Sequence, residues 1–581
     1  MKSKRLLSVL MLLLLSAGIF AQSEDEAGKT KEMERRKMVL IESMLADSRE
    51  LKLGENRAIM FARIGGRLWD LDQKRARDLF QDAISELLGA QAAAEAGRKP
   101  GQQNELLAGQ STRPQILQTI ATRDAEFALQ SFYKSRPALI ERAISNSKAR
   151  NTKIGNHPGT DRQYAQTELQ LEQMLIRMAA DQNPEKAIAL LKAALKSGIS
   201  GETLGLLQKV FEKDPAAAKD LASEVAGQLA RKPFIISDQL DYQTIQVATS
   251  ILSEHVRDRP ATEKALWFDA SQMASLAERL IAFHIDKGNQ FGYGTGPQIV
   301  LIAEKLAPAS VEKLKQVEKT MPRYGGGLRY YSQDLEVSRL LNGETPVEQM
   351  LTEASKLSVT SRTQIYQAAA NRIGSAGDIS RARNLLSEYL SDDALENAEN
   401  SLNWTYTQHL IGADRFAEAE ALIDEFPDSN RINALISLAN SVFNRDEQKH
   451  KSYAAALIEK ARAQLPPKPE TNAEMSNMIQ IISAYSRIEP TEAFRMIDAL
   501  IQPINEIAEA SVIVNGFQGS SYSVRQGEMI VSQGNSLGIY FDTSIFRNLS
   551  QIDFDRTLNT IGGLSRREMR LSFKQQLLEG L

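Results

Sequence analysis

The sequence predicts an all-α protein, an α-solenoid of antiparallel helix pairs with a period of about 37 residues and irregular loop segments between some of them. Three observations lead to this prediction. Aromatic residues make up only 6% of the chain, while alanine, leucine, glutamate, arginine and lysine are abundant, and this composition favours helix over strand. Helix-start signals recur along the sequence, and each is followed by apolar residues on one helical face. In the second half of the chain the signals return at a nearly constant interval.

The first 21 residues have the layout of a secretory signal peptide. Basic residues at positions 2, 4 and 5 precede an apolar run from Leu6 to Phe20, and the small residue Ala21 precedes a polar segment. The alternative is an uncleaved membrane anchor, but this run of 15 residues is short against the roughly 20 that span a bilayer. We therefore expect cleavage after Ala21 and an exported protein, periplasmic or secreted.

Composition excludes several classes of function. The chain has no cysteine, so disulfides, thiolate metal sites and a cysteine nucleophile are excluded. The net charge is −3, and it would be −6 without the three cations of the first 21 residues. Acids and bases are nearly balanced and no dense basic tract occurs, so the sequence gives no indication of nucleic-acid binding.

The helix-start signal is a polar residue placed just before a helix, where its side chain can accept hydrogen bonds from free backbone N–H groups. In most copies an alanine follows four residues later, and large apolar residues follow at seven and eight. Proline occupies the first helical position in three copies, where its missing N–H costs least. The starting residues are Asp72, Asp124, Asn183, Asp214, Asp378, Arg415, Lys451 and Glu489, and a divergent copy with Thr557 in place of alanine starts at Asp553.

This spacing has a mechanical reason. Positions four, seven and eight lie on one face of a helix, and alanine there lets a neighbouring helix approach closely. The signal should therefore open the second helix of a pair, and upstream segments with apolar residues three and four apart should form the first helix. These segments are residues 55–69, 113–122, 169–180 and 362–374.

The period is clearest in the second half of the chain. The starts at residues 378, 415, 451 and 489 give intervals of 37, 36 and 38 residues. A held period indicates a repeat array more strongly than any single helical pattern does.

The helix pairs resemble the tetratricopeptide family, an all-helical superhelix used for protein interaction, in the alanine at plus four and the large apolar residue at plus eight. The units here are longer than those of the family. They lack the Trp/Leu/Gly/Tyr pattern of the family's first helix, which only Gly65 matches. The resemblance implies a tetratricopeptide-like α-solenoid that binds another protein. The chain also resembles soluble lytic transglycosylases in being an exported helical superhelix. In that family a lysozyme-like domain with a catalytic glutamate before a serine follows the superhelix. The Glu-Ser pair of this chain, Glu42-Ser43, lies at the opposite end of the sequence.

Loops rich in glycine, asparagine and glutamine are expected to interrupt the array, the first of them at residues 89–112. A later stretch, 515–544, contains short strand-like runs. The resulting division is a signal peptide (1–21), N-terminal repeats (22–145), a loop or linker (146–163), central repeats with Gly/aromatic loops (164–345), regular repeats (346–509), an irregular and possibly strand-containing loop (510–550) and a C-terminal helical pair (551–581).

No motif for chemistry is complete. The stretch "GNSLG" around Ser536 fits a nucleophile elbow, but no histidine follows His450. The five histidines include no pair at metal-ligand spacing. The segment "GYGTGP" (292–297) could offer N–H groups to an anion but lacks the lysine of a phosphate-binding loop. The sequence therefore predicts no catalytic residue, no cofactor and no metal site.

The candidate binding residues are aromatic and arginine side chains in the central glycine-rich loops. Such side chains can anchor a protein partner or stack on a sugar. The alternative is that they fold inward and fill the end of a helix layer, because buried aromatic residues are common. The candidates are Phe291, Tyr293, Arg323, Tyr324, Arg329, Tyr330 and Tyr331.

The sequence thus favours an exported scaffold that binds a polypeptide partner. An alternative is an enzyme that processes a cell-envelope polymer at a site assembled from the loops, and a further one is a structural envelope component without a discrete site. Two carboxylates that face each other in a cleft beside the aromatic loops would indicate the enzyme.

Overall fold

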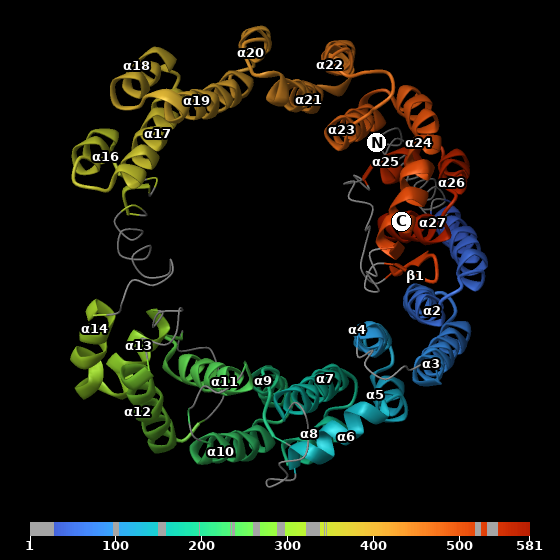
Figure 1. Cartoon of the computed structure of the whole chain (residues 1–581), viewed down its shortest axis with the longest axis vertical. Coiled ribbons are helices and arrows are strands. Elements are labelled where there is room, and N and C mark those ends of the chain that lie inside the picture. Colours follow the sequence, from blue (N-terminus) through green and yellow to red (C-terminus); the bar gives the residue numbers. More distant parts are fainter. Residues whose placement is uncertain are drawn as a thin grey trace, which may run out of the picture. The chain divides into compact units, whose positions relative to one another are not determined.

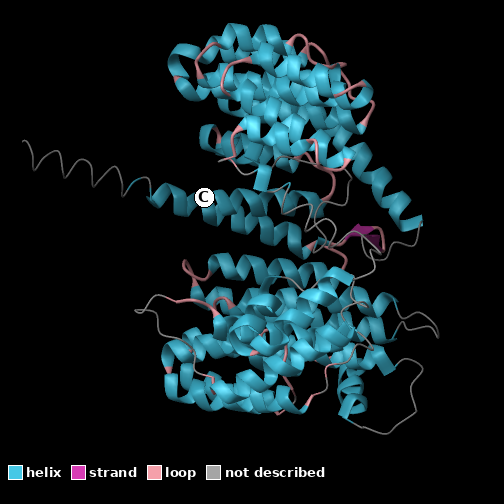
Figure 2. Ribbon diagram, turned by 90° about the vertical axis from the view of Figure 1, so that its left-hand side faces the viewer, coloured by secondary structure: helices cyan, strands magenta, loops and turns pink. Residues whose placement is uncertain are grey.

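The structure is a computed structural model of the whole chain, and almost all of the part that it describes is helical (Figures 1 and 2). It describes residues 30–96, 104–148, 158–196, 198–232, 239–259, 268–287, 297–320, 345–517, 524–531 and 544–581, together with positions 28, 234, 337, 339–341 and 343. The predicted all-α solenoid is confirmed.

The chain forms two compact units. Unit 1 contains residues 1–90, 96–108 and 370–581, and unit 2 contains residues 91–95 and 109–369. Unit 2 is therefore inserted in the sequence between two parts of unit 1. Its helices, with α4 and α17 crossing the boundaries, are α4 (Asn104–Ala121), α5 (Ala125–Lys134), α6 (Ala138–Lys148), α7 (Pro158–Gln182), α8 (Pro184–Leu195), α9 (Thr203–Lys213), α10 (Pro215–Arg231), α11 (Gln239–Val256), α12 (Ala270–Lys287), α13 (Pro297–Leu306), η2 (Pro308–Ser310), α14 (Val311–Thr320), α16 (Val347–Ala354) and α17 (Val359–Ser375).

Unit 1 combines the first helices of the chain with its last repeats. It begins with a helix over residues 30–49, and its one described sheet is a hairpin of two short strands. The other elements are α2 (Gly54–Leu68), α3 (Gln73–Ala96), α18 (Ile379–Tyr389), α19 (Asp392–Gly412), α20 (Phe416–Ile423), α21 (Asp428–Arg445), α22 (Glu447–Arg462), α23 (Asn472–Ile488), α24 (Pro490–Phe517), β1 (Val524–Arg525), β2 (Glu528–Met529), α25 (Ser544–Ile552), α26 (Phe554–Gly562) and α27 (Arg567–Gly580).

Six of the predicted helix starts carry the expected side-chain cap, whereas Arg415 before α20 forms no such bond. Asp378 precedes α18, and its carboxylate accepts the backbone N–H of Arg381 at 3.0 Å. At five other starts, the backbone N–H three residues further on donates in the same way to the side chain of the starting residue. Proline is the first residue of α8, α10 and α24. The capping side chains are those of Asp72, Asp124, Asn183, Asp214 and Asp553.

The alanine four residues after seven of the predicted starts is buried completely. Thr557, which replaces alanine in the divergent copy, is equally inaccessible. Only small side chains stand at these positions, so the pattern sets how closely the paired helices pack. These residues are Ala76, Ala128, Ala187, Ala218, Ala382, Ala419 and Ala493.

Gly65 shows the same constraint in a first helix. A Cβ atom added there would lie 2.8 Å from the ring of Phe80 on α3, closer than carbon atoms approach without overlap. Gly374 on α17 is similar, because its Cβ would lie 2.5 Å from Leu402 on α19. Both glycines are explained by close approach to a neighbouring helix.

One predicted start is out of register. The helix assigned to begin after Lys451 is α22, which begins at Glu447, and the capping side chain is that of Asp446. The buried residue is Ala454, whereas Ala455 is only half-buried. The intervals on either side of Asp446 are therefore 31 and 43 residues, although the average from 378 to 489 is still 37. The first buried alanine of α22 therefore lies eight residues after the capping residue, and not four as in the other copies.

Three predicted loops, at residues 89–112, 146–163 and 510–550, are partly helical. Helix α3 continues to Ala96 and α4 begins at Asn104, inside the expected loop at 89–112. Helix α7 begins at Pro158, inside the expected linker at 146–163, and α24 continues to Phe517. Runs such as "AQAAAEA" have high helix propensity, and the glycines and glutamines around them do not end the helices.

Polar contacts join successive second helices on the surface. Lys460 on α22 binds Glu420 and Asp424 on α20 at 2.9 and 2.8 Å. The hydroxyl of Tyr453 donates to the same Glu420 at 2.8 Å. Burial first, and then this hydrogen bond, raise the pKa of Tyr453. Many charged side chains are thus engaged in holding one repeat to the next.

A hairpin from the end of the chain is bound by its beginning. The turn at Gln526 and Gly527 has positive φ angles of 51° and 73°, as a two-residue hairpin requires. It directs Glu528 to the N-terminus of α2, where its carboxylate accepts the backbone N–H groups of Lys52 and Leu53. The positive end of the helix dipole favours a carboxylate at this place.

Asn56 completes this contact. Its side-chain amide donates to Glu528 and to the carbonyl of Met529, both at 2.7 Å, and its oxygen accepts the N–H of Val531. Asn56 is fully buried and Glu528 is 5% exposed. The residues that meet here are about 475 positions apart in the sequence.

A second contact joins the helix 30–49 to α27. Asp47 binds Arg570 at 2.7 Å and Lys574 at 2.6 Å. Burial by itself would raise the pKa of Asp47, but the hydrogen bonds from the two cations outweigh it and lower the pKa below 3.8. We call the contacts of residues 43–57 with 524–531 and 566–574 the terminal seam.

In unit 2 a buried charge cluster holds three helices. Arg113 binds both oxygens of Glu168 at 2.8 and 3.0 Å, and Arg136 adds a bond of 2.8 Å. Both guanidinium groups lie over the ring of Phe132. Because every charge in this cluster has a partner, its burial is compatible with a stable fold.

Replacing Ala419 by leucine should lower the free energy of unfolding by about 1–3 kcal/mol, because the added atoms overpack the contact between α20 and its neighbours. Urea unfolding followed by circular dichroism measures the change. Ala417→Leu is the matched control, since Ala417 is exposed on the same helix and the change there should stay within about 0.5 kcal/mol. Equal effects of the two substitutions would refute the packing role of the fourth position.

Replacing Asp47 by asparagine should cost about 3 kcal/mol at neutral pH, because it leaves two partly buried cations without their carboxylate. A carboxylate with a lowered pKa stabilises the fold fully above its unfolded pKa and loses that effect as pH falls through the folded pKa. The difference from the parent should therefore shrink below pH 3.8.

Unfolding curves at several pH values measure this difference, with Glu50→Gln as the control. Glu50 forms an exposed pair with Arg567 at 3.6 Å, which should contribute at most about 1 kcal/mol. A difference that is independent of pH would contradict the assignment.

Candidate functional site

The residues predicted to bind a partner are not covered by the structure. All seven candidates, Phe291, Tyr293, Arg323, Tyr324, Arg329, Tyr330 and Tyr331, lie outside the described residues. Ser536 of the glycine-rich "GNSLG" stretch also lies outside them. The role of these side chains therefore stays a prediction from the sequence.

Within the described part of the chain, no group of three or more histidine, aspartate or glutamate side chains is placed to hold a metal ion. Each described helix is too short or too polar to serve as a membrane-spanning segment.

One pair in the terminal seam has the composition of a serine–lysine dyad. The ammonium of Lys574 donates to the hydroxyl of Ser43 at 2.7 Å. A dyad needs a lysine that can take the serine proton, but Lys574 also donates to Asp47 at 2.6 Å. This arrangement holds Lys574 as a donor between two acceptors, which is a structural role.

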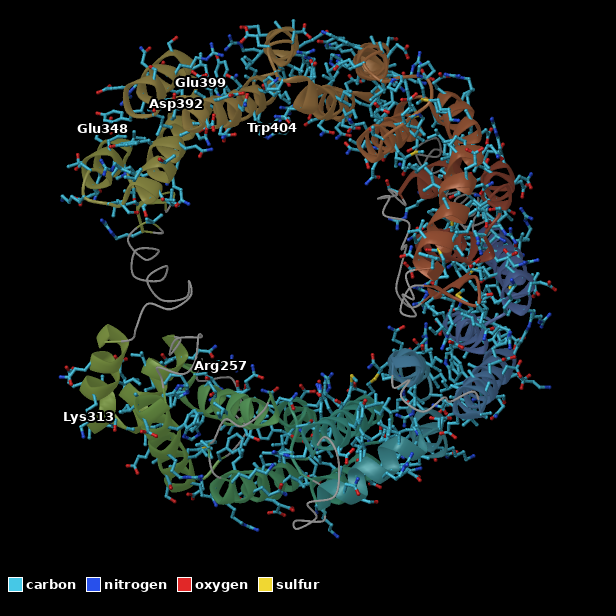
Figure 3. The ribbon with its side chains drawn as sticks, viewed as in Figure 1. Arg257, Lys313, Glu348, Asp392, Glu399 and Trp404 are labelled. Carbon is cyan, nitrogen blue, oxygen red and sulfur yellow. The ribbon has the colours of Figure 1, made fainter. Side chains whose placement is uncertain are left out.

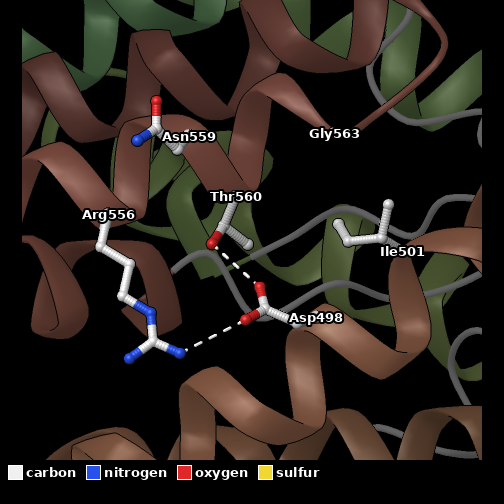
Figure 4. Close-up of a pocket in the computed structure, with 6 residues that line it drawn as sticks. All are labelled: Asp498, Ile501, Arg556, Asn559, Thr560 and Gly563. Carbon is white, nitrogen blue, oxygen red and sulfur yellow. Dashed lines mark hydrogen bonds and ion pairs between the residues drawn. The ribbon is translucent and has the colours of Figure 1, made fainter.

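One hollow among the described residues lies in unit 1 between α24 and α26 (Figure 4). It is open to solvent and has a volume of about 340 Å³. The two helices belong to adjacent repeats. One face of each helix and the turn that follows α26 form the lining. The lining residues are Asp498, Ile501, Arg556, Asn559, Thr560 and Gly563.

Asp498 is at the centre of the hollow. One carboxylate oxygen accepts the hydroxyl of Thr560 at 3.1 Å, and the other accepts an N–H of Arg556 at 3.4 Å. The side chains of Asp498 and Arg556 are 47% and 43% exposed. This ion pair is therefore accessible and weak compared with the pairs of the terminal seam.

The aromatic ring of Phe494 helps to fix the position of Arg556. Its guanidinium lies 4.2 Å from the centre of the Phe494 ring, and Phe494 is buried on α24. A cation over an aromatic face is attracted by the ring. The ring therefore helps to hold the guanidinium of Arg556 beside Asp498, which accepts one of its N–H groups.

No motif in the sequence predicts this hollow. Asp498 and Arg556 are 58 residues apart and belong to no motif. The only indication was indirect, because Glu489 and Asp553 were both predicted to start helices. The helical register after each start predicts the face of the helix on which Asp498 or Arg556 lies. It does not predict that α24 and α26 are neighbours.

A separate surface feature is the end of α24. Three large apolar side chains there are exposed, with Phe517 93%, Ile513 70% and Val514 53% accessible. Residues 510–517 contain no charged residue. Exposed apolar groups that gather at one place are more informative than single ones, and they often mark an interaction site.

Another exposed aromatic residue is Trp404 on α19 (Figure 3). Its side chain is 40% accessible. It stands alone among large apolar residues of that helix, and single exposed apolar residues are common on protein surfaces. We therefore assign it no site.

No protein-family model matches the chain, and the curated proteins contain no match to it. Among solved structures, the chain is similar to a protein described as a circular tandem repeat protein with novel repeat topology and enhanced subunit contact surfaces. The identity is 12%, the TM-score is 0.13, and the alignment covers 94% of this chain and 96% of that chain. At this TM-score the similarity carries no argument about function.

Proposed function

We propose that this protein is an exported helical-repeat scaffold that binds a polypeptide partner. The helical-repeat fold is its firm basis, since arrays of helix pairs offer extended surfaces and bind other proteins in many unrelated cases. The tetratricopeptide-like spacing of the second helices supports the same reading. Export rests on the signal-peptide layout of residues 1–21.

The observation that carries the proposal is the exposed apolar end of α24. Ile513, Val514 and Phe517 present apolar surface to solvent at the end of a helix whose preceding turns are well packed. Interfaces concentrate their binding energy in a few large side chains, often aromatic, that become buried on association. Phe517 has the size and accessibility of such an anchor.

The chemistry of this surface also indicates the kind of partner. Because residues 510–517 carry no charge, long-range electrostatic attraction does not select the partner there. An apolar segment of a polypeptide would gain by removing these three side chains from water. We therefore expect the partner to contribute apolar side chains at this point.

No observation among the described residues favours the alternative function, an enzyme that processes a cell-envelope polymer. Its candidate loops are the same central segments that lie outside the described part of the chain. The seven aromatic and arginine residues there stay a second predicted binding surface of the scaffold.

The test is affinity capture from an envelope extract with the mature protein and with Ile513→Gln/Val514→Gln/Phe517→Gln. The triple variant should lose the retained polypeptide, because its end of α24 offers polar side chains in place of the apolar ones. Glutamine keeps helix propensity high, and equal circular dichroism and urea midpoints verify the fold.

Val359→Gln/Ile552→Gln is the matched control, since these two side chains are 75% and 66% exposed on other helices. The control should retain the same polypeptide as the parent. Retention by the triple variant, or equal loss from both variants, would contradict an interaction site at the end of α24.

A further inference from the structure

The hollow between α24 and α26 has both hydrogen-bond donors and hydrogen-bond acceptors that are unused. Each oxygen of Asp498 accepts one bond, and a carboxylate has about four acceptor positions in total. Arg556 uses one of its five side-chain N–H groups on Asp498. The amide of Asn559 makes no side-chain hydrogen bond with any described residue.

The charges of the hollow restrict what can bind there. A carboxylate ligand would be attracted by Arg556 but repelled by Asp498, and an ammonium ligand would meet the opposite pair of forces. A neutral amide avoids both conflicts, because its carbonyl can accept from Arg556 or Asn559 while its N–H donates to Asp498. The hollow is therefore complementary to a group that carries a donor and an acceptor side by side.

Size and setting agree with this chemistry. A hollow of about 340 Å³ holds roughly ten water volumes, which is enough for a side chain or one peptide unit. Ile501 forms an apolar wall, and the ring of Phe494 fixes Arg556. The Asp498–Arg556 pair is exposed, so a ligand that bridges it gives up little.

We propose that this hollow binds the neutral side-chain amide of an asparagine or glutamine in a polypeptide. This inference deepens the proposed function and rests on it for the source of the amide. An N-acetylated sugar carries the same chemistry, but sugars are usually held against an open aromatic face. Here Phe494 is only 2% exposed and is covered by Arg556.

The test uses small probes and the full mature chain with ¹³C-labelled isoleucine methyl groups. The methyl signal of Ile501 should shift in a saturable way with N-acetylglutamine N-methylamide. The glutamate counterpart, which has a carboxylate in place of the amide, should bind about tenfold more weakly because of Asp498. Equal binding of the two probes, or no shift of the Ile501 signal, would overturn the proposal.

Two variants separate the hollow from the rest of the surface. Asp498→Asn should weaken binding of the glutamine probe about fivefold or more, since the charged acceptor is lost. Asp555→Asn is the control, because Asp555 is exposed on α26 outside the lining, and it should leave binding unchanged. Equal effects of the two variants would overturn the assignment.

N-acetylglucosamine provides the third arm. Binding of this sugar without binding of the glutamine probe would overturn the polypeptide source. Since no partner protein is used, failure of this experiment is distinguishable from failure of the proposed function, which is tested by capture at the end of α24.

Discussion

The structure depends on one constraint, that a helix pair in a repeat array can bury its apolar face only against its neighbours. The alanines at the fourth position let each helix approach the next, and the first and last helices of any array would otherwise lack a neighbour. In unit 1 the helices at residues 30–68 pack with the last repeats of the chain. Glu528 and Asp47 make the specific polar contacts of this seam, so the two ends of the sequence cover each other.

The terminal seam differs in character from the contacts between repeats. Between the regular repeats at residues 378–489, apolar side chains fill the interface and ion pairs such as Lys460–Glu420 lie at its exposed edge. At the seam, Asn56, Glu528 and Lys574 are themselves buried. Buried polar groups need matching partners in defined places, so they fix which surfaces meet and in what register. The seam thereby gives specificity where the regular repeats give close packing.

The predictable part of this protein is local in sequence. Asp378 and Ala382 are four residues apart, and the physics of a cap and of one helical face connects them, so the fold class followed from such patterns. The terminal seam and the α24/α26 hollow join residues tens to hundreds of positions apart, which no local pattern reveals. The predicted start at Lys451 is wrong because α22 departs from the local pattern, with its buried Ala454 eight residues after the cap Asp446 and not four. The predicted aromatic binding residues lie outside the described part of the chain.

The most direct test of this account is a cross-link across the terminal seam. The chain has no cysteine, so Glu50→Cys/Arg567→Cys would carry the only two thiols, at positions whose native side chains approach to 3.6 Å. A short bismaleimide should join them within one molecule, as shown by a monomeric product and a single linked peptide pair. No link, or a link only between molecules, would contradict the conclusion that the two ends of the chain form one unit.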